Sequence, residues 1–189
     1  MINSVMNKLF TKKLTIYQLG NPQLREKAEP ITNVQDPKIQ KLIDEMLFTL
    51  RESRGVGLAA PQIGRSLQLI IIASHPNNRY PHAPLMEPTA MINPRIVSHT
   101  EETEKGWEGC LSVPMIRGLV PRYRQITVEY CDRQGNQQVK ELDGFVARIF
   151  QHEYDHLEGK VFLDRVESNL DLVSESEYYR NNQTNPKDI

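Results

Sequence analysis

The chain has few cysteines and no long hydrophobic run. Two of its 189 residues are cysteines, Cys110 and Cys131, which is too few for the disulfide framework of a small secreted protein. A reduced chain fits this number better than a disulfide-bonded one. The longest unbroken apolar run covers residues 69–73, far short of the ~20 residues that a membrane span needs. We therefore expect a cytoplasmic protein with no membrane segment.

An excess of either charge is also lacking. The formal net charge is -1 and the pI is near 6.5, so no global basic field favours binding to nucleic acid. Arg117, Arg122 and Arg124 lie close together in the sequence. They form either a local basic patch or a solvated face, and we favour the solvated face. No direct binding of nucleic acid is expected.

The two ends of the sequence differ from the region between them. Residues 1–13 contain lysines and no acidic residue, as in a transit peptide, but lack the apolar segment of a signal peptide. We interpret them as an N-terminal extension. Residues 14–172 suit a single domain, with no internal repeat or linker. Residues 173–189 are polar, and we interpret them as a C-terminal tail without assigned structure.

Periodicity in the sequence predicts an α+β fold. Apolar residues at helical spacing from Ile39 to Leu50, after Asp36 and Pro37 as capping residues, predict a helix that ends near Glu52. Residues 67–73 are expected to form a strand that is buried on both faces, and residues 89–98 a strand that is interrupted or edged at Pro94. Residues 126–132 and 137–142 are expected to form a hairpin. The glycine-rich residues 55–64 are expected to form a loop or tight turn, and residues 75–88 a long loop.

The stretch QHEYDHLEG, residues 151–159, contains the most specific chemical pattern. His152 and His156 are four residues apart on a predicted helix bounded by Asp143 and Gly159. Side chains at this spacing share one helix face, so both imidazoles can bind one metal ion. Glu153 points beside such an ion, where it can accept a proton from water. Two surface histidines are the alternative, but with five histidines in the chain the pattern is rare by chance, and we favour a metal site.

A catalytic metal site usually needs a third protein ligand. The downstream candidates are carboxylates outside any recognisable motif: Glu158, Glu167, Glu175 and Glu177. Upstream, the stretch GWEGCLSVP (residues 106–114) presents Cys110 in a turn-rich segment. Metal binding would drive deprotonation of this thiol. A lone cysteine is otherwise a small buried apolar residue, but beside the two histidines we favour Cys110 as the ligand.

Two other functional classes share part of this pattern. A zinc endopeptidase would have the same helix motif but a downstream third ligand. A non-catalytic domain with a structural metal would close the site with four protein ligands, and no convincing fourth ligand is present in the sequence. Replacing Cys110 distinguishes a zinc endopeptidase, which would keep its metal and activity. Replacing Glu153 distinguishes a structural metal domain, which would unfold and lose its metal.

Three stretches together resemble the motifs of one family. They are GVGLAAPQIG (55–64), EGCLSVP (108–114) and QHEYDHLEG (151–159). In this order and spacing they are similar to the three motifs of peptide deformylases, and the similarity covers roughly residues 14–166. The resemblance implies antiparallel or mixed sheets packed around a central metal-binding helix, with residues 14–172 as the catalytic domain. It also implies removal of the N-formyl group from formyl-methionyl nascent polypeptides, releasing formate, at the ribosome.

The resemblance also implies roles for single residues. Cys110, His152 and His156 match the metal ligands, and the metal is usually Fe²⁺ in cells, although Zn²⁺ and Ni²⁺ bind the same ligands. Glu153 matches the catalytic glutamate. The remaining matches are Gln62 and the Leu111 backbone N–H as oxyanion donors, Val56 and Gly57 as the edge that pairs with the substrate backbone, and Arg117 near the entrance.

The helix itself offers candidates for an apolar substrate pocket. Phe145 and Ile149 lie seven and three residues before His152, so one helix face carries all three. Either a pocket for the methionine side chain or simple core packing explains them. The group that accepts the second N–H of a ligating histidine is not identifiable from the sequence.

Overall fold

The computed structural model describes residues 12–76, 80 and 82–183. The extension predicted over 1–13 therefore lies outside the described residues up to residue 11. In these ranges the α-helices are α2 (Pro37–Ser53), α3 (Gly144–Leu157) and α4 (Glu175–Gln183). The strands are β1 (Gly57–Ala59), β2 (Leu69–Ser74), β3 (Met86–His99), β4 (Thr103–Cys110), β5 (Val113–Tyr123), β6 (Gln125–Cys131), β7 (Gln137–Asp143) and β8 (Leu172–Ser174). Short 3-10 helices cover Pro22–Arg25, Ala60–Ile63, Phe162–Arg165 and Asn169–Asp171.

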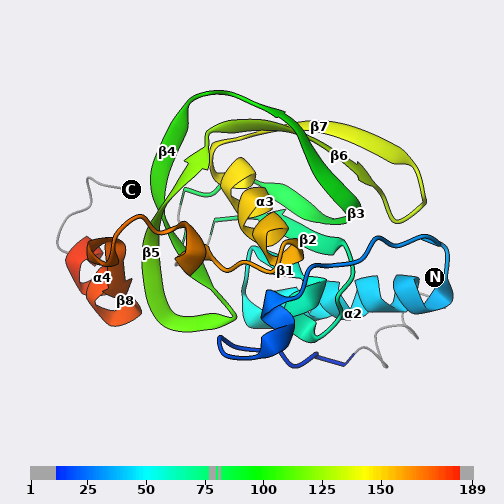
Figure 1. Cartoon of the computed structure of the whole chain (residues 1–189), viewed down its shortest axis with the longest axis horizontal. Helices are drawn as coiled ribbons and strands as arrows, with labels where there is room; N and C mark the ends of the chain where they lie inside the picture. Colours follow the sequence, from blue (N-terminus) through cyan, green and yellow to red (C-terminus); the bar gives the residue numbers. More distant parts are fainter. Residues whose placement is uncertain (1–11, 77–79, 81, 184–189) are drawn as a thin grey trace.

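The strands form two antiparallel sheets. One has five strands in the order β1-β2-β3-β6-β7, and the other has three in the order β4-β5-β8. Every pairing between these strands is antiparallel. Helix α3 lies in the middle of the molecule, between the β4–β5 ribbon and the larger sheet (Figure 1). The predicted α+β class, with sheets around a central helix, is confirmed.

Strand β2 separates the two main parts of the hydrophobic core. Ile70 and Ile72 pack into a cluster with residues of α3, whereas Leu69 and Ile71 pack into a second cluster with residues of α2. Alternate side chains of a strand point to opposite faces, and all six residues of β2 are buried. The sequence prediction of a strand buried on both faces is confirmed, and this core holds β1 and α3 in fixed positions.

Local signals in the sequence correctly located several element ends. The Asp36 side chain accepts a hydrogen bond from the Lys38 backbone N–H at 2.8 Å and caps α2. Asn93 has a positive φ of 49°, and the β3–β6 register shifts between Ile92 and Arg95. The interruption expected at Pro94 is therefore confirmed as a bulge, since proline cannot donate to the ladder.

The strands β4 and β5 were missed by the sequence analysis. Strand β4 has mostly exposed or half-buried residues, so it shows no clear apolar alternation that would predict a strand. Its stability comes from pairing with β5, in which residues opposite each other run from Thr103–Tyr123 to Gly109–Arg117. Residues 55–64, which were expected to form a loop or tight turn, include β1 and the 3-10 helix Ala60–Ile63.

The polar C-terminal region is more ordered than its composition suggested. Residues from 172 to 183 form β8 and α4, and the last residues, 184–189, lie outside the described part. Pairing of β8 with β5, and contacts of α4 with a buried arginine, supply the order that local hydrophobicity does not. The expectation of a tail without structure is thus corrected up to residue 183.

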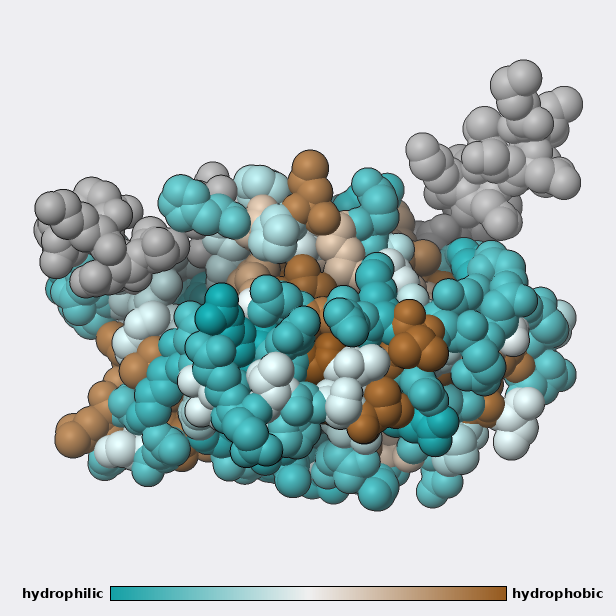
Figure 2. All heavy atoms as spheres, turned by 90° about the horizontal axis from the view of Figure 1, so that it is seen from above, coloured by the Kyte–Doolittle hydropathy of each residue, from teal (hydrophilic) through white to brown (hydrophobic). Residues whose placement is uncertain are grey.

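One face of the molecule is mainly polar (Figure 2). The face shown in Figure 2 is mostly hydrophilic, with small separate hydrophobic areas. In the described part of the chain, no helix combines the length and the apolar character that crossing a membrane would require.

Candidate active site

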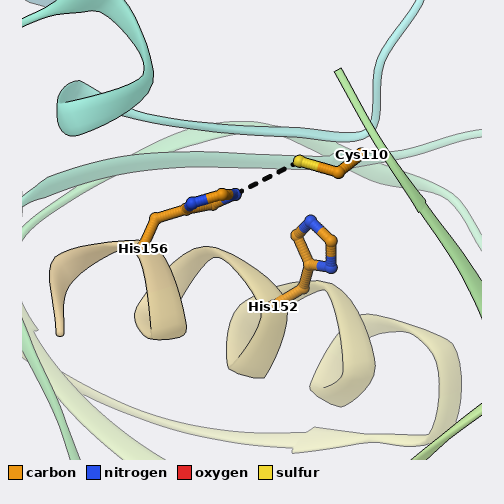
Figure 3. A group of neighbouring side chains, drawn as sticks. All are labelled: Cys110, His152 and His156. Atoms are coloured by element: carbon orange, nitrogen blue, oxygen red, sulfur yellow. Dashed lines mark hydrogen bonds between the residues drawn. The ribbon is translucent and has the colours of Figure 1, made fainter. Parts of the chain in front are cut away.

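Cys110, His152 and His156 converge at the centre of the molecule. The Cys110 Sγ lies 3.3 Å from the His156 Nε2, and one ligand atom from each of the three residues lies within 4.8 Å of the others. Figure 3 shows both imidazoles rising from one face of α3 toward the sulfur atom. The tertiary structure therefore brings together the three ligands that the sequence analysis favoured.

Two elements hold these donors. Helix α3 presents the two imidazole rings with centroids 5.4 Å apart and planes at 76°, as expected for residues one turn apart. Cys110 is the last residue of β4, and the tight connection to β5 follows it. The backbone N–H of Ser112 in this connection donates to the Cys110 Sγ at 3.3 Å. The sulfur is thus fixed by a hairpin, not by a flexible loop.

The alternative downstream ligands lie elsewhere. Each of the four carboxylates pairs with a basic residue: Glu158 with Lys27, Glu167 with Lys105, Glu175 with Arg117 and Glu177 with Arg180. The group of ligand atoms near His152 and His156 among the described residues includes Cys110 and none of these carboxylates. The geometry therefore supports Cys110 as the third donor.

The donor set fits a divalent ion. Burial by itself raises the pKa of the Cys110 thiol, but the facing His156 and His152 rings outweigh burial and hold this pKa well below its ordinary value. A thiolate and two imidazole nitrogens are ligands that zinc and iron accept. The His156 Nδ1 is buried without a hydrogen-bond partner among the described residues, and its Nε2 faces the sulfur. These three residues form a candidate metal site.

Glu108 orients His152 from behind. Its Oε2 lies 2.8 Å from the His152 Nδ1, and its two oxygens accept hydrogen bonds from Arg122 at 2.9 and 3.0 Å. Burial raises the pKa of Glu108, but His152 and Arg122 outweigh burial and lower it well below the ordinary value. An ionised carboxylate only accepts, so Nδ1 carries the proton and Nε2 is left for an ion. This is the partner that the sequence did not identify.

The arginines predicted to form a solvated face are not all at the surface. Arg122 is buried, and its Nη1 donates to Asp155 at 2.6 Å in addition to the two bonds with Glu108. Arg117 is buried as well, whereas Arg124 is exposed. The prediction of a solvated face is therefore wrong for Arg117 and Arg122. These two charges are stabilised inside the protein by carboxylates from distant parts of the chain.

Replacing Glu108 tests this support. We expect Glu108→Gln to weaken metal binding roughly 10- to 100-fold, because the neutral amide lacks the negative charge with which the carboxylate holds the His152 Nδ1–H and raises the basicity of the ring. We also expect a loss of roughly 3 to 5 kcal/mol in the free energy of unfolding, since Arg122 loses a buried partner. Chelator competition and denaturant unfolding measure the two effects. Glu104→Gln, at an exposed position of the same strand, should change neither; equal losses in both variants would contradict the assignment.

Glu153 lies beside the donors and against β1. Its side chain is buried, and its Oε2 has no hydrogen-bond partner among the described residues. Burial raises the pKa of Glu153 to about 7, and a nearby divalent cation would act in the opposite direction. A Cβ placed on Gly57 would lie only 2.1 Å from the Glu153 Oε1. Gly57 is therefore required for the close approach of β1 to this carboxyl group.

Gln62 joins the site from the 3-10 helix after β1. Its Oε1 accepts a hydrogen bond from the Ala59 N–H at 2.8 Å. Its Nε2 donates to the Ser112 Oγ at 3.1 Å and lies 3.4 Å from the Cys110 Sγ. The amide N–H groups are thus turned toward the metal donors, and Leu111 lies between Cys110 and Ser112 in the adjacent connection.

A cavity opens in front of these groups. Among the residues that the sequence analysis named, those that line it are Val56, Gly57, Gln62, Cys110, Leu111, Phe145, Ile149, His152 and Glu153. Arg117 does not line the cavity. It lies behind Gly109, where a Cβ would approach its guanidinium to 3.0 Å. The position expected for Arg117, near the entrance, is corrected to a buried one.

Two further aromatic residues of the cavity wall were missed. Tyr80 and Trp107 both line the cavity. Trp107 is the single tryptophan of the chain and lies three residues before Cys110. This closeness in sequence to Cys110 was the only signal that could have placed Trp107 at the site. The segment containing Tyr80 lies far from every motif in the sequence, so no local pattern could place this ring at the site.

Comparison with known proteins agrees with this geometry. The family model for polypeptide deformylase matches residues 13–171. Peptide deformylase 2 of Nostoc sp. is 61% identical over 165 residues, covering 87% of this chain and 92% of that protein. Peptide deformylase 1 of Bordetella pertussis is 47% identical over 151 residues, covering 80% and 86%.

A solved structure shows the same similarity in three dimensions. The class I type b peptide deformylase from Acinetobacter baumannii with bound Met-Ala-Ser superposes with a TM-score of 0.81 at 41% identity. The match covers 83% of this chain and 100% of that one. From the family match, the relatives and the shared fold around the Cys-His-His group, we conclude that this chain belongs to the polypeptide deformylase family.

Proposed function

We propose that this enzyme removes the formyl group from formyl-methionyl peptides with Glu153 as the proton carrier and one ion on Cys110, His152 and His156. As a polypeptide deformylase, the chain is a metal-dependent hydrolase that acts on formylated nascent peptides and releases formate. The observation that supports the residue roles best is the convergence of three ligand atoms beside the buried Glu153, whose Oε2 has no hydrogen-bond partner among the described residues.

Glu153 is suited to moving a proton between water and the leaving amine. A divalent ion bound to the three donors supplies Lewis acidity and lowers the pKa of water near it. The Glu153 carboxyl group is adjacent to His152 in the sequence, lines the cavity and is desolvated. In this position Glu153 accepts the proton of the attacking water and then donates it to the nitrogen that leaves as a free N-terminus.

Two N–H groups can meet the negative charge on the formyl oxygen. The Gln62 side-chain amide is held in place by the Ala59 N–H and the Ser112 hydroxyl. The backbone N–H of Leu111 follows Cys110 in the cavity lining. Preorganised donors of this kind each contribute ~3 kcal/mol to transition-state stabilisation. We assign the oxyanion site to these two groups.

The peptide binds as an additional strand along β1. This strand is at the edge of the five-stranded sheet and pairs only with β2 among the described strands. Val56 and Gly57 line the cavity, and because the Val56 C=O already accepts from the Ala73 N–H at 2.8 Å, we assign the remaining backbone groups of these two residues to pairing with an extended peptide. Such main-chain hydrogen bonds do not depend on the peptide sequence, which suits an enzyme that processes many chains. Phe145 and Ile149 in the cavity lining then receive the methionine side chain.

The cellular setting is part of the proposal. We assign Fe²⁺ as the native ion, with Zn²⁺ or Ni²⁺ able to occupy the same ligands, because thiolate and imidazole accept all three. We also place the enzyme in the cytoplasm, acting on chains as they leave the ribosome, without direct contact with nucleic acid. The near-neutral charge of the chain supports the last point.

Release of formate tests the proposed function directly. We expect anaerobically prepared enzyme loaded with Fe²⁺ to release one formate for each formyl-Met-Ala dipeptide consumed, and acetyl-Met-Ala to remain intact. Coupled formate dehydrogenase and amine-reactive labelling measure the two products. Cleavage of the Met–Ala bond in place of formate release would identify an endopeptidase and contradict the proposal.

A further inference from the structure

The C-terminal element packs behind the cavity wall. Strand β8 pairs with β5, with Val173 opposite Arg117, and α4 follows directly. In Figure 1 both elements lie beside β5, at the end of the molecule far from α2. None of the candidate metal ligands comes from this element. Its contacts with the cavity are made through two aromatic residues of the wall.

The first connection runs through Arg117. The Arg117 Nη2 donates to the Glu175 Oε1 at 2.9 Å and to the Tyr179 hydroxyl at 3.0 Å, both on α4. The Arg117 Nη1 donates to the Tyr80 hydroxyl at 3.2 Å. The Tyr80 ring in turn lies 4.7 Å from the Phe145 ring, and both rings line the cavity. Helix α4 thus holds one side of the wall through a buried guanidinium group.

The second connection is a direct ring contact. Trp107 lines the cavity, and the Tyr178 ring of α4 packs edge-on behind it with centroids 5.5 Å apart and planes at 63°. Aromatic pairs prefer this edge-to-face arrangement, which fixes ring orientation as well as distance. Two contacts of α4 therefore end at the aromatic rings that face the cavity, and Arg117 joins them, since its guanidinium also lies 5.2 Å from the Tyr178 ring centroid.

We infer that helix α4 positions the aromatic wall of Tyr80, Trp107 and Phe145, and so sets the affinity for the apolar side chain at the peptide N-terminus. The inference rests on the proposed function and extends its side-chain pocket beyond Phe145 and Ile149. Cys110 is held by the β4–β5 hairpin and His152 and His156 by α3. Tyr178 acts on binding as a positioning residue, because it contacts the wall and not the reacting atoms.

A variant at Tyr178 tests the inference, with the chain's single tryptophan as reporter. In metal-loaded Tyr178→Ala we expect KM for formyl-Met-Ala to rise about three- to tenfold with kcat within about twofold of wild type. The KM for formyl-Gly-Ala, which has no side chain to reach the wall, should change less than about twofold. Trp107 emission should shift to longer wavelength. Tyr178→Phe keeps the ring and should restore all three values.

Two further variants keep the test decisive. Arg180→Gln, an exposed position on the same helix, should behave as wild type. If Tyr178→Ala does not fold, Tyr179→Phe decides in its place, because it removes the hydroxyl that accepts from Arg117 and should raise the same KM. An unchanged KM for formyl-Met-Ala in a folded variant, or a fall in kcat alone, overturns the inference.

Failure of the proposed function is recognised separately. If the wild-type enzyme releases no formate from formyl-Met-Ala, the function is wrong. The positioning role is then decided by the tripeptide Met-Ala-Ser as a probe, with its Kd measured from the change in Trp107 fluorescence. A weaker Kd in Tyr178→Ala than in Arg180→Gln supports the role of α4, and equal values overturn it.

Discussion

Replacing Glu153 with glutamine should reduce kcat by roughly 10²- to 10⁴-fold while the metal stays bound. The amide has nearly the same shape as the carboxyl group, so it can occupy the space between His152 and Gly57. It cannot accept the proton of water, and the chemical step therefore loses its proton carrier. Because the donors at Cys110, His152 and His156 are unchanged, the metal content should remain close to one ion for each chain.

The measurement combines formate release with metal analysis on the same sample. Glu158→Gln is a matched control, since Glu158 lies at the end of the same helix and pairs with Lys27 near the surface. Surface ion pairs of this kind contribute little to stability, so this variant should retain full activity. Loss of both metal and folded structure in Glu153→Gln would instead indicate a structural metal site and refute the catalytic role.

Replacing Cys110 with serine should remove both the metal and the activity. A hydroxyl is a poor substitute for a thiolate, because it is not deprotonated near neutral pH and is a harder ligand. The expected loss of metal affinity exceeds the roughly 10- to 100-fold effect of substitutions outside the ligand set. Activity should fall in proportion to the metal that is lost.

Metal titration and formate release check this prediction. Cys131→Ala serves as the control, because Cys131 is the chain's other cysteine and is buried in the core between β2 and α2. It should lose some stability and keep its metal. Full metal content and activity in Cys110→Ser would show that another residue is the third ligand and would contradict the site described above.

Helix α3 and its pair of metal-binding histidines could be predicted from the sequence, because they depend on local spacing. Residues four apart share one face of a helix whatever surrounds it, so His152 and His156 could be paired before any fold was known. Capping at Asp36, the interruption of the strand at Pro94 and the end of the helix before Gly159 were also predicted correctly. Each depends on the backbone preferences of one or two residues.

The strands of the smaller sheet could not be predicted from the sequence, because they depend on pairing with other strands and not on local spacing. Strand β4 has mostly exposed or half-buried residues, so its position depends on pairing with β5 and not on its own apolar pattern. For the same reason the C-terminal residues after 172 were expected to lack structure, although β8 adds to this sheet. Polar segments become ordered where a partner strand supplies hydrogen bonds, and a single sequence does not show the partner.

The sequence by itself determined the donor types, the two histidines that share a helix face and the carboxyl group beside them. The sequence also favoured Cys110 as the sulfur, but only the tertiary structure showed that it meets the histidines and which second carboxylate lies beside them. The β4–β5 register brings Cys110 to His156 and Glu108 to His152, and it buries Arg117 and Arg122 against carboxylates from α4 and α3. Helical spacing acts over a few residues, whereas these contacts join residues that are 33 to 58 positions apart and depend on how the two sheets and α3 pack together.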